Sequence, residues 1–600
     1  MEQLQRARAV FRRWRAAFLR TELRLAPSES QRLFVLTLMV GVLCGLAAVA
    51  FHLSIKLVEH HLIDRALAAP GRSWILFGIL SPTLGALVCG ALLHWVVPGA
   101  RGSGVPQVKV AYASRLGVVR LRDAAGKFII GAIQIGSGSS LGREGPTVQI
   151  CAGVASSLGR LARLSPQSRR RLLPVGAAAG IAAAFNAPIA AVTFTIEELV
   201  GKLDQTVLSG VIVAAAIAAV IERSVLGAHP VFDIPHPFVL DDARSLVLYA
   251  ALGIVAAMAS VVFTDGLLGL RRRMRAQKVV PPALQPAIGG LVTGLLAVGT
   301  LYWLRTGGIT GGGYEVLHAS LSSELGVKVM LVLGAAKLIA TVFSYSTGGA
   351  GGIFAPALFI GAMIGGAFGS LDRTIFHHPD AALGAFALVG MGAVFSATVR
   401  APMTSVLIIV EMTSGYGLIL PLMIANMTAY ALARHWRKEP IYEALLSQDG
   451  IHLRESAALD ALEDLPLPEL VDRSGAHVVF QPGSSAREIL ERTEGTQRAV
   501  HAVVGEDGVL VGLITQSDVA TLLAEPGLAL LVTAADLMRP VVSVSIDDDL
   551  RVAFEAMRSA KLPELPVLDR AGAIVGFIDE ASIARAYLRA SAPKSVRQVG

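Results

Sequence analysis

"AGKFIIGAIQIGSGSSLGREGPTVQI", residues 125–150, has a second copy further along the chain, "AAKLIATVFSYSTGGAGGIFAPALFI", residues 335–360. The two stretches align without gaps, and Lys127 pairs with Lys337. Two shorter pairs flank them in the same order: "RGSGVPQV" (101–108) with "TGGGYEVL" (310–317), and "NAPIAAVTFTIEE" (186–198) with "RAPMTSVLIIVEM" (400–412). We infer that the chain contains two copies of one unit. Repeats of this kind are typical of transporters, which bind their substrate where the copies meet.

The repeats lie in a chain of 600 residues, of which 53% are hydrophobic and 16% charged; a soluble domain carries about 25% charged residues. Four apolar stretches have spanning length, 33–53, 74–97, 246–263 and 284–304. Many others are shorter or broken by glycine and proline, which is tolerated at membrane depth only inside protein or around a cavity. We therefore expect an all-α polytopic membrane domain over 32–446, with repeats at about 32–222 and 245–446.

Basic residues cluster in short loops and near the start of the chain, which predicts a cytoplasmic N-terminus. Residues 1–31 have the pattern of an amphipathic helix on the membrane surface. The net charge of +8 follows from these clusters and does not indicate nucleic-acid binding. The three cysteines make neither a disulfide framework nor a zinc spacing, so no metal site is predicted.

The segment "GREGP" (142–146) places a glutamate at the predicted start of a helix, between apolar flanks. Free backbone N–H groups at a helix start attract anions. Glu144 is therefore either a helix-capping carboxylate or a tethered competitor that occupies a site for a mobile anion and leaves it when protonated. We favour the second interpretation, because a charge at membrane depth is costly.

Two further glycine-rich helix starts can face the same site. "GSGVP" (102–106) offers the hydroxyl of Ser103, and "GIFAP" (352–356) carries Phe354 at the position that Glu144 holds in the first repeat. Neutral donors suit a monovalent anion, because conduction requires weak binding.

Together these three segments and Tyr442 in "KEPIYEALL" (438–446) resemble the CLC family of chloride channels and proton/chloride exchangers. The resemblance implies a homodimer with one pore per subunit and two inverted repeats of tilted, partly broken helices in a cell membrane. It also implies the site residues. The hydroxyls of Ser103 and Tyr442 and the amides of Ile353 and Phe354 would hold chloride, and Glu144 would be the external gate. Serine at position 103 points to chloride rather than nitrate.

The resemblance leaves open whether the protein is an exchanger or a passive, voltage- or pH-gated channel. Family exchangers generally carry a second, cytoplasmic-side glutamate, which matches Glu198. Its neighbour Glu197 has a repeat partner in Glu411 and is predicted to be structural, whereas Met412 stands opposite Glu198. We therefore expect Glu198 to relay protons and the protein to exchange chloride for protons; the alternatives are a solvated helix end and a passive channel.

The soluble tail repeats as well: "GVLVGLITQSDVA" (508–520) pairs with "GAIVGFIDEASIA" (572–584), each predicted to belong to a strand–turn–strand–helix unit. After a linker at 447–470, the tail resembles two α/β CBS domains, at 471–526 and 535–592, which we expect in the cytoplasm. In the first, Thr515 and Asp518 match the residues that would bind the phosphate and ribose of an adenine nucleotide. The second has Asp579 at the phosphate position, which favours a module that reinforces the dimer.

An enzyme of the membrane interior would need paired catalytic groups, and the apolar segments contain no such motif. We therefore expect a transport protein with no required cofactor. Its partners would be chloride, protons, the lipid bilayer and a second subunit. The compact chain favours a bacterial inner membrane.

Overall fold

The computed structural model describes residues 29–114, 117–201, 205–227, 231–232, 244–376, 381–451, 467–474, 477–496, 498–524 and 532–591. The chain divides into two compact units, Met1–Ile451 and His452–Gly600. Nearly all of the predicted amphipathic helix at 1–31 and most of the predicted linker at 447–470 lie outside the described residues.

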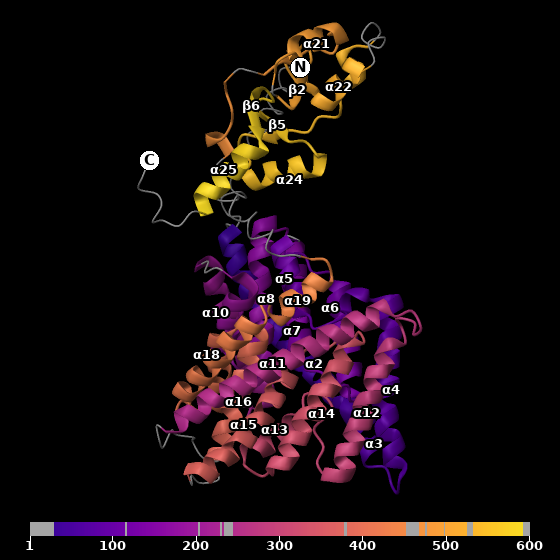
Figure 1. Ribbon diagram of the computed structural model, residues 1–600, viewed down its shortest axis with the longest axis vertical. Coiled ribbons are helices and arrows are strands. Elements are labelled where there is room, and N and C mark those ends of the chain that lie inside the picture. Colours follow the sequence, from indigo (N-terminus) through magenta and orange to yellow (C-terminus); the bar gives the residue numbers. More distant parts are fainter. Residues whose placement is uncertain are drawn as a thin grey trace, which may run out of the picture. The chain divides into compact units, whose positions relative to one another are not determined.

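The first unit is helical throughout its described part (Figure 1). Its first half contains α2 (Glu29–Glu59), α3 (Arg65–Leu67), α4 (Ser73–Ala91), α5 (Val105–Ser114), α6 (Leu121–Gly136), α7 (Glu144–Leu161), α8 (Pro166–Phe185), α9 (Pro188–Phe194) and α10 (Gln205–Leu226). Its second half contains α11 (Ser245–Ala276), α12 (Gln285–Leu304), α13 (Tyr314–Leu321), α14 (Val327–Ser346), α15 (Phe354–Phe376), α16 (Ala381–Val399), α17 (Pro402–Thr413), α18 (Ile419–Trp436) and α19 (Ile441–Gln448). The π-helical segments are η1 (His60–Asp64), η2 (Leu92–Val96) and η4 (Thr195–Val200), and η3 (Pro98–Ala100) is a 3-10 turn.

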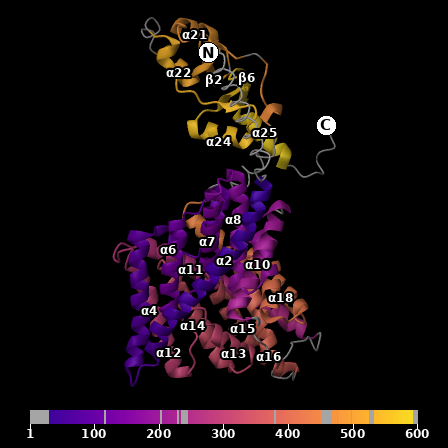
Figure 2. The ribbon, with the colours of Figure 1, turned by 180° about the vertical axis from the view of Figure 1, so that it is seen from behind.

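Within the described residues, seven helices are long and apolar enough to cross a membrane: Gln31–Leu67, Ser73–Val96, Val207–Leu226, Ser245–Ala276, Gln285–Leu304, Val327–Ser346 and Phe354–Ile375. These helices contain nearly all of the four stretches that the sequence predicts to span, which confirms a multi-pass membrane protein. Helices α2, α8 and α10 pack side by side (Figure 2). Shorter apolar helices such as α17 lie among the long ones, as expected for partly broken helices.

A buried lysine organises the glycine-rich loop of each repeat. Nζ of Lys127 donates a hydrogen bond of 2.6 Å to the carbonyl of Gly102. Nζ of its repeat partner Lys337 lies within hydrogen-bond distance of four successive carbonyls, the nearest that of Gly311 at 2.7 Å. Both lysine side chains are fully buried. Because a buried ammonium needs acceptors for its protons, each lysine fixes the loop that leads into α5 or α13.

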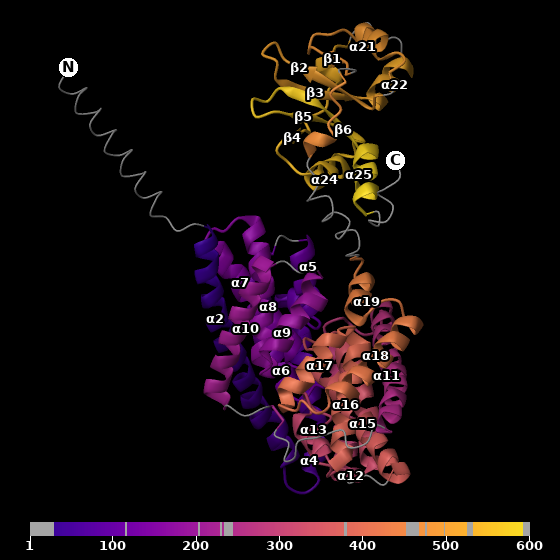
Figure 3. The ribbon, with the colours of Figure 1, turned by 90° about the vertical axis from the view of Figure 1, so that its left-hand side faces the viewer.

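Two carboxylates join the repeats reciprocally. Glu411 accepts hydrogen bonds from the amides of Ile189 and Ala190 at the start of α9, at 3.0 and 2.7 Å. Glu197 accepts from the amides of Met403 and Thr404 at the start of α17, at 3.1 and 2.9 Å. Each glutamate therefore caps a helix of the other repeat, and the two helices lie side by side (Figure 3). This confirms the prediction that the paired carboxylates are structural.

The described residues of the second unit form two three-stranded sheets with the same strand order and pairing. One has the order β1 (Val479–Phe480), β2 (Val500–Val504), β3 (Leu510–Thr515), and the other β4 (Val544–Ser545), β5 (Glu564–Leu568), β6 (Ile574–Asp579). In each sheet the first pair is parallel and the second antiparallel. The helices are η5 (Leu467–Glu469), α21 (Ala486–Thr493), α22 (Gln516–Ala524), α23 (Ala534–Leu537), α24 (Leu550–Ala560) and α25 (Glu580–Ser591). The predicted strand–turn–strand–helix units are β2–β3–α22 and β5–β6–α25.

Candidate functional site at the meeting of the two repeats

The two repeated loops meet through their backbones. The amide of Gly142 donates to the carbonyl of Gly352 at 2.8 Å, and the amide of Gly352 donates to the carbonyl of Gly142 at 2.7 Å. A Cβ on Gly145 would lie 2.4 Å from the carbonyl oxygen of Ser103, so only glycine permits this approach. All three glycine-rich segments singled out in the sequence therefore lie together.

Glu144 is the first residue of α7, and its side chain is fully buried. Its Oε1 accepts a hydrogen bond of 2.5 Å from the hydroxyl of Tyr314. Its Oε2 lies 3.4 Å from the amide of Ala355, the second residue of α15, and accepts from it. The carboxylate of one repeat is thus held at the N-terminus of a helix of the other, where the helix dipole favours negative charge.

Arg143, the charged neighbour of Glu144, contacts other residues. A terminal nitrogen of Arg143 donates to the carbonyl of Ala184 at 3.0 Å, another contacts the ring of His52, and the guanidinium lies over the ring of Tyr314. The arginine of "GREGP" therefore packs the helices around the site.

Two hydroxyl groups, those of Ser103 and Tyr442, are fully buried. Neither has a hydrogen-bond partner among the described residues. Leaving a buried hydroxyl without a partner costs about 1–3 kcal/mol. Each hydroxyl is therefore a free donor, one just before the start of α5 and one on α19.

The start of α15 carries the two residues whose amides the sequence analysis singled out. Ile353 and Phe354 are buried, and the first amides of a helix have no partner within it. The ring of Phe354 contacts four other aromatic rings, those of Phe185, Phe194, Phe395 and Tyr442. This aromatic packing fixes the end of α15 against the Tyr442 side chain.

Glu198 lies in η4 with only 5% of its side chain exposed. Its Oε1 forms an ion pair of 2.8 Å with Nζ of Lys109 on α5, which also lies 3.5 Å from Oε1 of Glu443 on α19. Lys109 thus connects Glu198 to the two helices associated with Ser103 and Tyr442.

Sequence reasoning overlooked Lys109 and Tyr314. Lys109 is a lone cation in an apolar segment of the first repeat, a signal that could have marked it. Tyr314 directly follows three glycines at a predicted helix start, and an aromatic hydroxyl there could have been read as a donor to the site.

The sequence model of the voltage gated chloride channel family matches residues 85–434, more than half of the chain. The chain belongs to the voltage-gated chloride channel family. The CBS domain model matches residues 467–525 and 534–589. The predicted resemblance to the CLC family, and with it the fold class, is confirmed.

Several CLC relatives cover most of this domain. The H(+)/Cl(-) exchange transporter ClcA of Vibrio cholerae is 33% identical over 68% of this chain and 88% of its own. That of Salmonella paratyphi A is 34% identical over 68% and 87%. A solved slow cyanobacterial Cl-/H+ antiporter is 26% identical with a TM-score of 0.64 and covers 70% of this chain and 98% of its own. A eukaryotic CLC transporter, at 19% identity and a TM-score of 0.61, covers 92% of this chain and 98% of its own and shares the fold.

In the first CBS domain, Thr515 and Asp518 contact each other. Oδ2 of Asp518 accepts from the amide of Thr515 at 2.9 Å and from its hydroxyl at 2.6 Å, and Arg539 donates to the same carboxylate. Burial alone would raise the pKa of Asp518, but hydrogen bonds from Arg539 and Thr515 outweigh it and hold the pKa below its usual range. In the second domain, Asp579 accepts from the amide of Ser582. Each aspartate thus bonds at the start of a helix.

Proposed function

We propose that this protein exchanges chloride for protons across the membrane, with Glu144 as the external gate and proton carrier. One observation carries the proposal: a fully buried carboxylate lies at the start of α15, bonded to the amide of Ala355 and the hydroxyl of Tyr314. Relatives that cover most of the membrane domain are named as H(+)/Cl(-) exchange transporters. The solved antiporter with 26% identity supports the same activity.

The proposed chloride site lies beside this carboxylate. Chloride would accept from the hydroxyls of Ser103 and Tyr442, which have no other partner among the described residues, and from the amides of Ile353 and Phe354. All four donors are neutral. Such donors stabilise a desolvated anion without holding it as tightly as a fixed cation, so that it can leave again.

Glu144 would alternate between two states. As a carboxylate it competes with chloride for the amides at the start of α15. When it takes up a proton it loses its charge, the attraction of the helix N-terminus weakens, and chloride can take its place. Each exchange of side chain for ion therefore moves a proton in the opposite direction to chloride.

A passive channel is the second candidate, and one observation favours it. Nζ of Lys109 lies 2.8 Å from Glu198, and an ion pair stabilises the charged form of the proposed proton relay. In the exchanger, Glu198 must release and take up protons despite this lysine. In a channel, the same pair would only connect helices.

The assembly and orientation belong to the proposal as well. We propose a homodimer in a bacterial inner membrane with the N-terminus and the CBS domains in the cytoplasm. The CBS pair would reinforce the dimer, because Thr515 and Asp518 already bond to each other and to neighbours. An adenine nucleotide would have to displace these bonds.

Proton movement into liposomes under an imposed chloride gradient tests the function. We expect the wild type to drive protons uphill and Glu144→Ala to keep chloride flux while losing proton movement. Glu198→Gln should also lose proton movement but keep the chloride flux. Chloride flux without proton movement in the wild type would identify a passive channel.

A further inference from the structure

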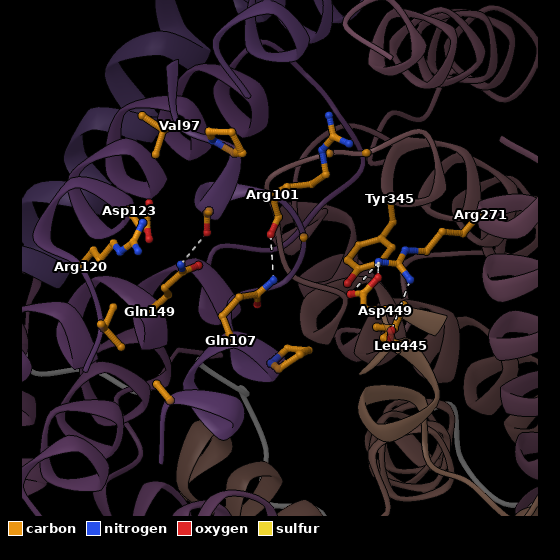
Figure 4. Close-up of a pocket in the computed structure, with 18 of the residues that line it drawn as sticks. Val97, Arg101, Gln107, Arg120, Asp123, Gln149, Arg271, Tyr345, Leu445 and Asp449 are labelled. Atoms are coloured by element: carbon orange, nitrogen blue, oxygen red, sulfur yellow. Dashed lines mark hydrogen bonds and ion pairs between the residues drawn. The ribbon is translucent and has the colours of Figure 1, made fainter. Parts of the chain in front are cut away.

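A cavity of about 740 Å³ lies beside the loop that carries Ser103 (Figure 4). Its wall includes Gly102 of this loop and Gln107 in the first turn of α5. Five arginines line it, Arg101, Arg120, Arg122, Arg271 and Arg275. Two aspartates, Asp123 and Asp449, line it with them. A monovalent chloride ion needs neither this volume nor this charge.

One of the two aspartates is already shared by two of the arginines. Oδ1 of Asp449 lies 2.9 Å from Arg271 and 2.6 Å from Arg275. Asp123 is then the remaining carboxylate of the lining. It packs closely against Gly99, because a Cβ atom added to Gly99 would lie only 2.5 Å from Oδ1 of Asp123. Three arginines of the lining thus face a single remaining acid.

Arg101 is one of the three arginines of the lining that form no ion pair with Asp449. Its Nε is buried and has no hydrogen-bond partner among the described residues. The charges of Arg275 and Arg271 repel that of Arg101. Its backbone is fixed, because the side-chain amide of Gln107 donates to its carbonyl at 2.9 Å while accepting from the amide of Gly104 at 2.9 Å. Among the described residues, no ion pair joins this guanidinium to a carboxylate.

A helix start adds to the positive potential. Helix α6 begins at Leu121 beside the cavity, and its N-cap residue Arg120 makes no side-chain capping bond. The dipole of α6 acts in the same direction as the arginines, and Asp123 in its first turn partly offsets it.

We propose that this cavity binds an anion with at least two linked phosphate groups. Guanidinium groups form paired hydrogen bonds with phosphate oxygens, and the volume lies within the range of small-molecule sites, roughly 300–1,000 Å³. The phosphates belong to a soluble polyphosphate or to a lipid headgroup. Resting on the proposed function, a bound polyanion blocks chloride, because Gly102 and Gln107 belong to the segment that presents Ser103.

Calorimetric titration of the full-length protein with pyrophosphate tests the site directly, independently of transport. We expect saturable binding that weakens with salt, since the contact is electrostatic. The double variant Arg101→Gln/Arg275→Gln should bind about tenfold or more weakly, because hydrogen bonds to charged groups are strong. The exposed pair Arg120→Gln/Arg122→Gln should show a similar loss and guards against a folding defect.

Arg272→Gln is the matched control, because Arg272 is exposed on the same helix as Arg275 and does not line the cavity; it should bind as the wild type does. Undiminished binding in both double variants, or loss of binding in Thr515→Ala alone, would overturn the site.

Chloride flux in liposomes then distinguishes the source of the phosphates. Inhibition by dissolved pyrophosphate indicates a soluble ligand, and inhibition by a phosphoinositide with adjacent phosphates in the bilayer indicates a lipid. Either inhibition must disappear in Arg101→Gln/Arg275→Gln. Pyrophosphate binding without either inhibition would retain the site and refute the block. Loss of proton coupling alone would refute the proposed exchange and leave the cavity unaffected.

Discussion

The hydroxyl of Tyr314 lies 2.5 Å from Oε1 of Glu144, across the boundary between the two repeats, and donates a hydrogen bond to it. Together with the amide of Ala355, it holds the carboxylate at the start of α15. In the proposed exchange, the strength of these two hydrogen bonds would set how readily chloride replaces the side chain.

Tyr314→Phe should strengthen chloride binding. The substitution removes a hydrogen bond to a charged group, worth about 1.5–3 kcal/mol, and so weakens the competitor of chloride. We expect chloride to bind about tenfold or more tightly in calorimetric titration. The same substitution in a Glu144→Gln background should change little. Unchanged affinity in the single variant would contradict competition by Glu144.

Lys109→Met should ease proton uptake by Glu198. The lysine lies 2.8 Å from Oε1 of Glu198 and stabilises its charged form, while Glu443 would then remain nearby with its negative charge. We expect the pH dependence of proton transport to move up by about one pH unit or more, which corresponds to about 1.4 kcal/mol. Lys56→Met, which removes an exposed ion pair with Glu59, is the control. A profile that stays in place would mean that Glu198 does not titrate during transport.

Glu197→Gln and Glu411→Gln should destabilise the membrane domain without uncoupling it. Each carboxylate caps a helix of the other repeat, and the loss of a cap costs about 1–2 kcal/mol. The midpoint of thermal unfolding in detergent should fall for both variants, whereas Glu315→Gln, at an exposed glutamate in the first turn of α13, should leave it unchanged. Intact stability with lost proton coupling would assign Glu197 or Glu411 to transport instead.

Asp518→Asn should weaken the first CBS domain only above the acidic range. The pKa of Asp518 is lower in the folded protein than in the unfolded chain, so its contribution is complete above the unfolded value of about 3.9 and is lost as the pH falls through the folded value. We expect the free energy of unfolding of this domain to fall by about 1 kcal/mol at pH 7. The measurement is hydrogen exchange in α22, which should become faster after correction for intrinsic rates. Exposed Glu506→Gln is the control. A loss of stability that does not shrink as the pH falls below the unfolded value would contradict the charge-based account.

Much of the membrane domain could be predicted because its sequence contains two copies of one unit. The alignment of Lys127 with Lys337 anticipates two lysine-bound loops, and the pairing of Glu197 with Glu411 anticipates a shared structural role. The alignment does not show that each glutamate caps a helix of the other repeat. Residues that match in the two copies bind each other's helices, which follows from three-dimensional symmetry and not from spacing.

The residues that sequence reasoning overlooked have no counterpart in the other repeat. Tyr314 aligns with Val105, and Lys109 aligns with His318. Their partners, Glu144 and Glu198, lie 170 and 89 residues away. In the first CBS domain, by contrast, the bonded residues lie close together in the sequence. The bonds between Thr515 and Asp518 span three residues, so their local capping could have been foreseen from the spacing alone.

The two caps that link the repeats also impose a delay during biosynthesis, because each glutamate and the helix it caps are synthesised far apart in time. Glu197 bonds to an amide 206 residues later in the chain, and Glu411 bonds to one 222 residues earlier. At about 5–20 residues per second, a ribosome needs roughly 10–40 seconds to cover such an interval. During that time the first half is already made while its carboxylate lacks the helix that it will cap. The nascent protein must therefore keep this acidic side chain hydrated or shielded until the second half arrives.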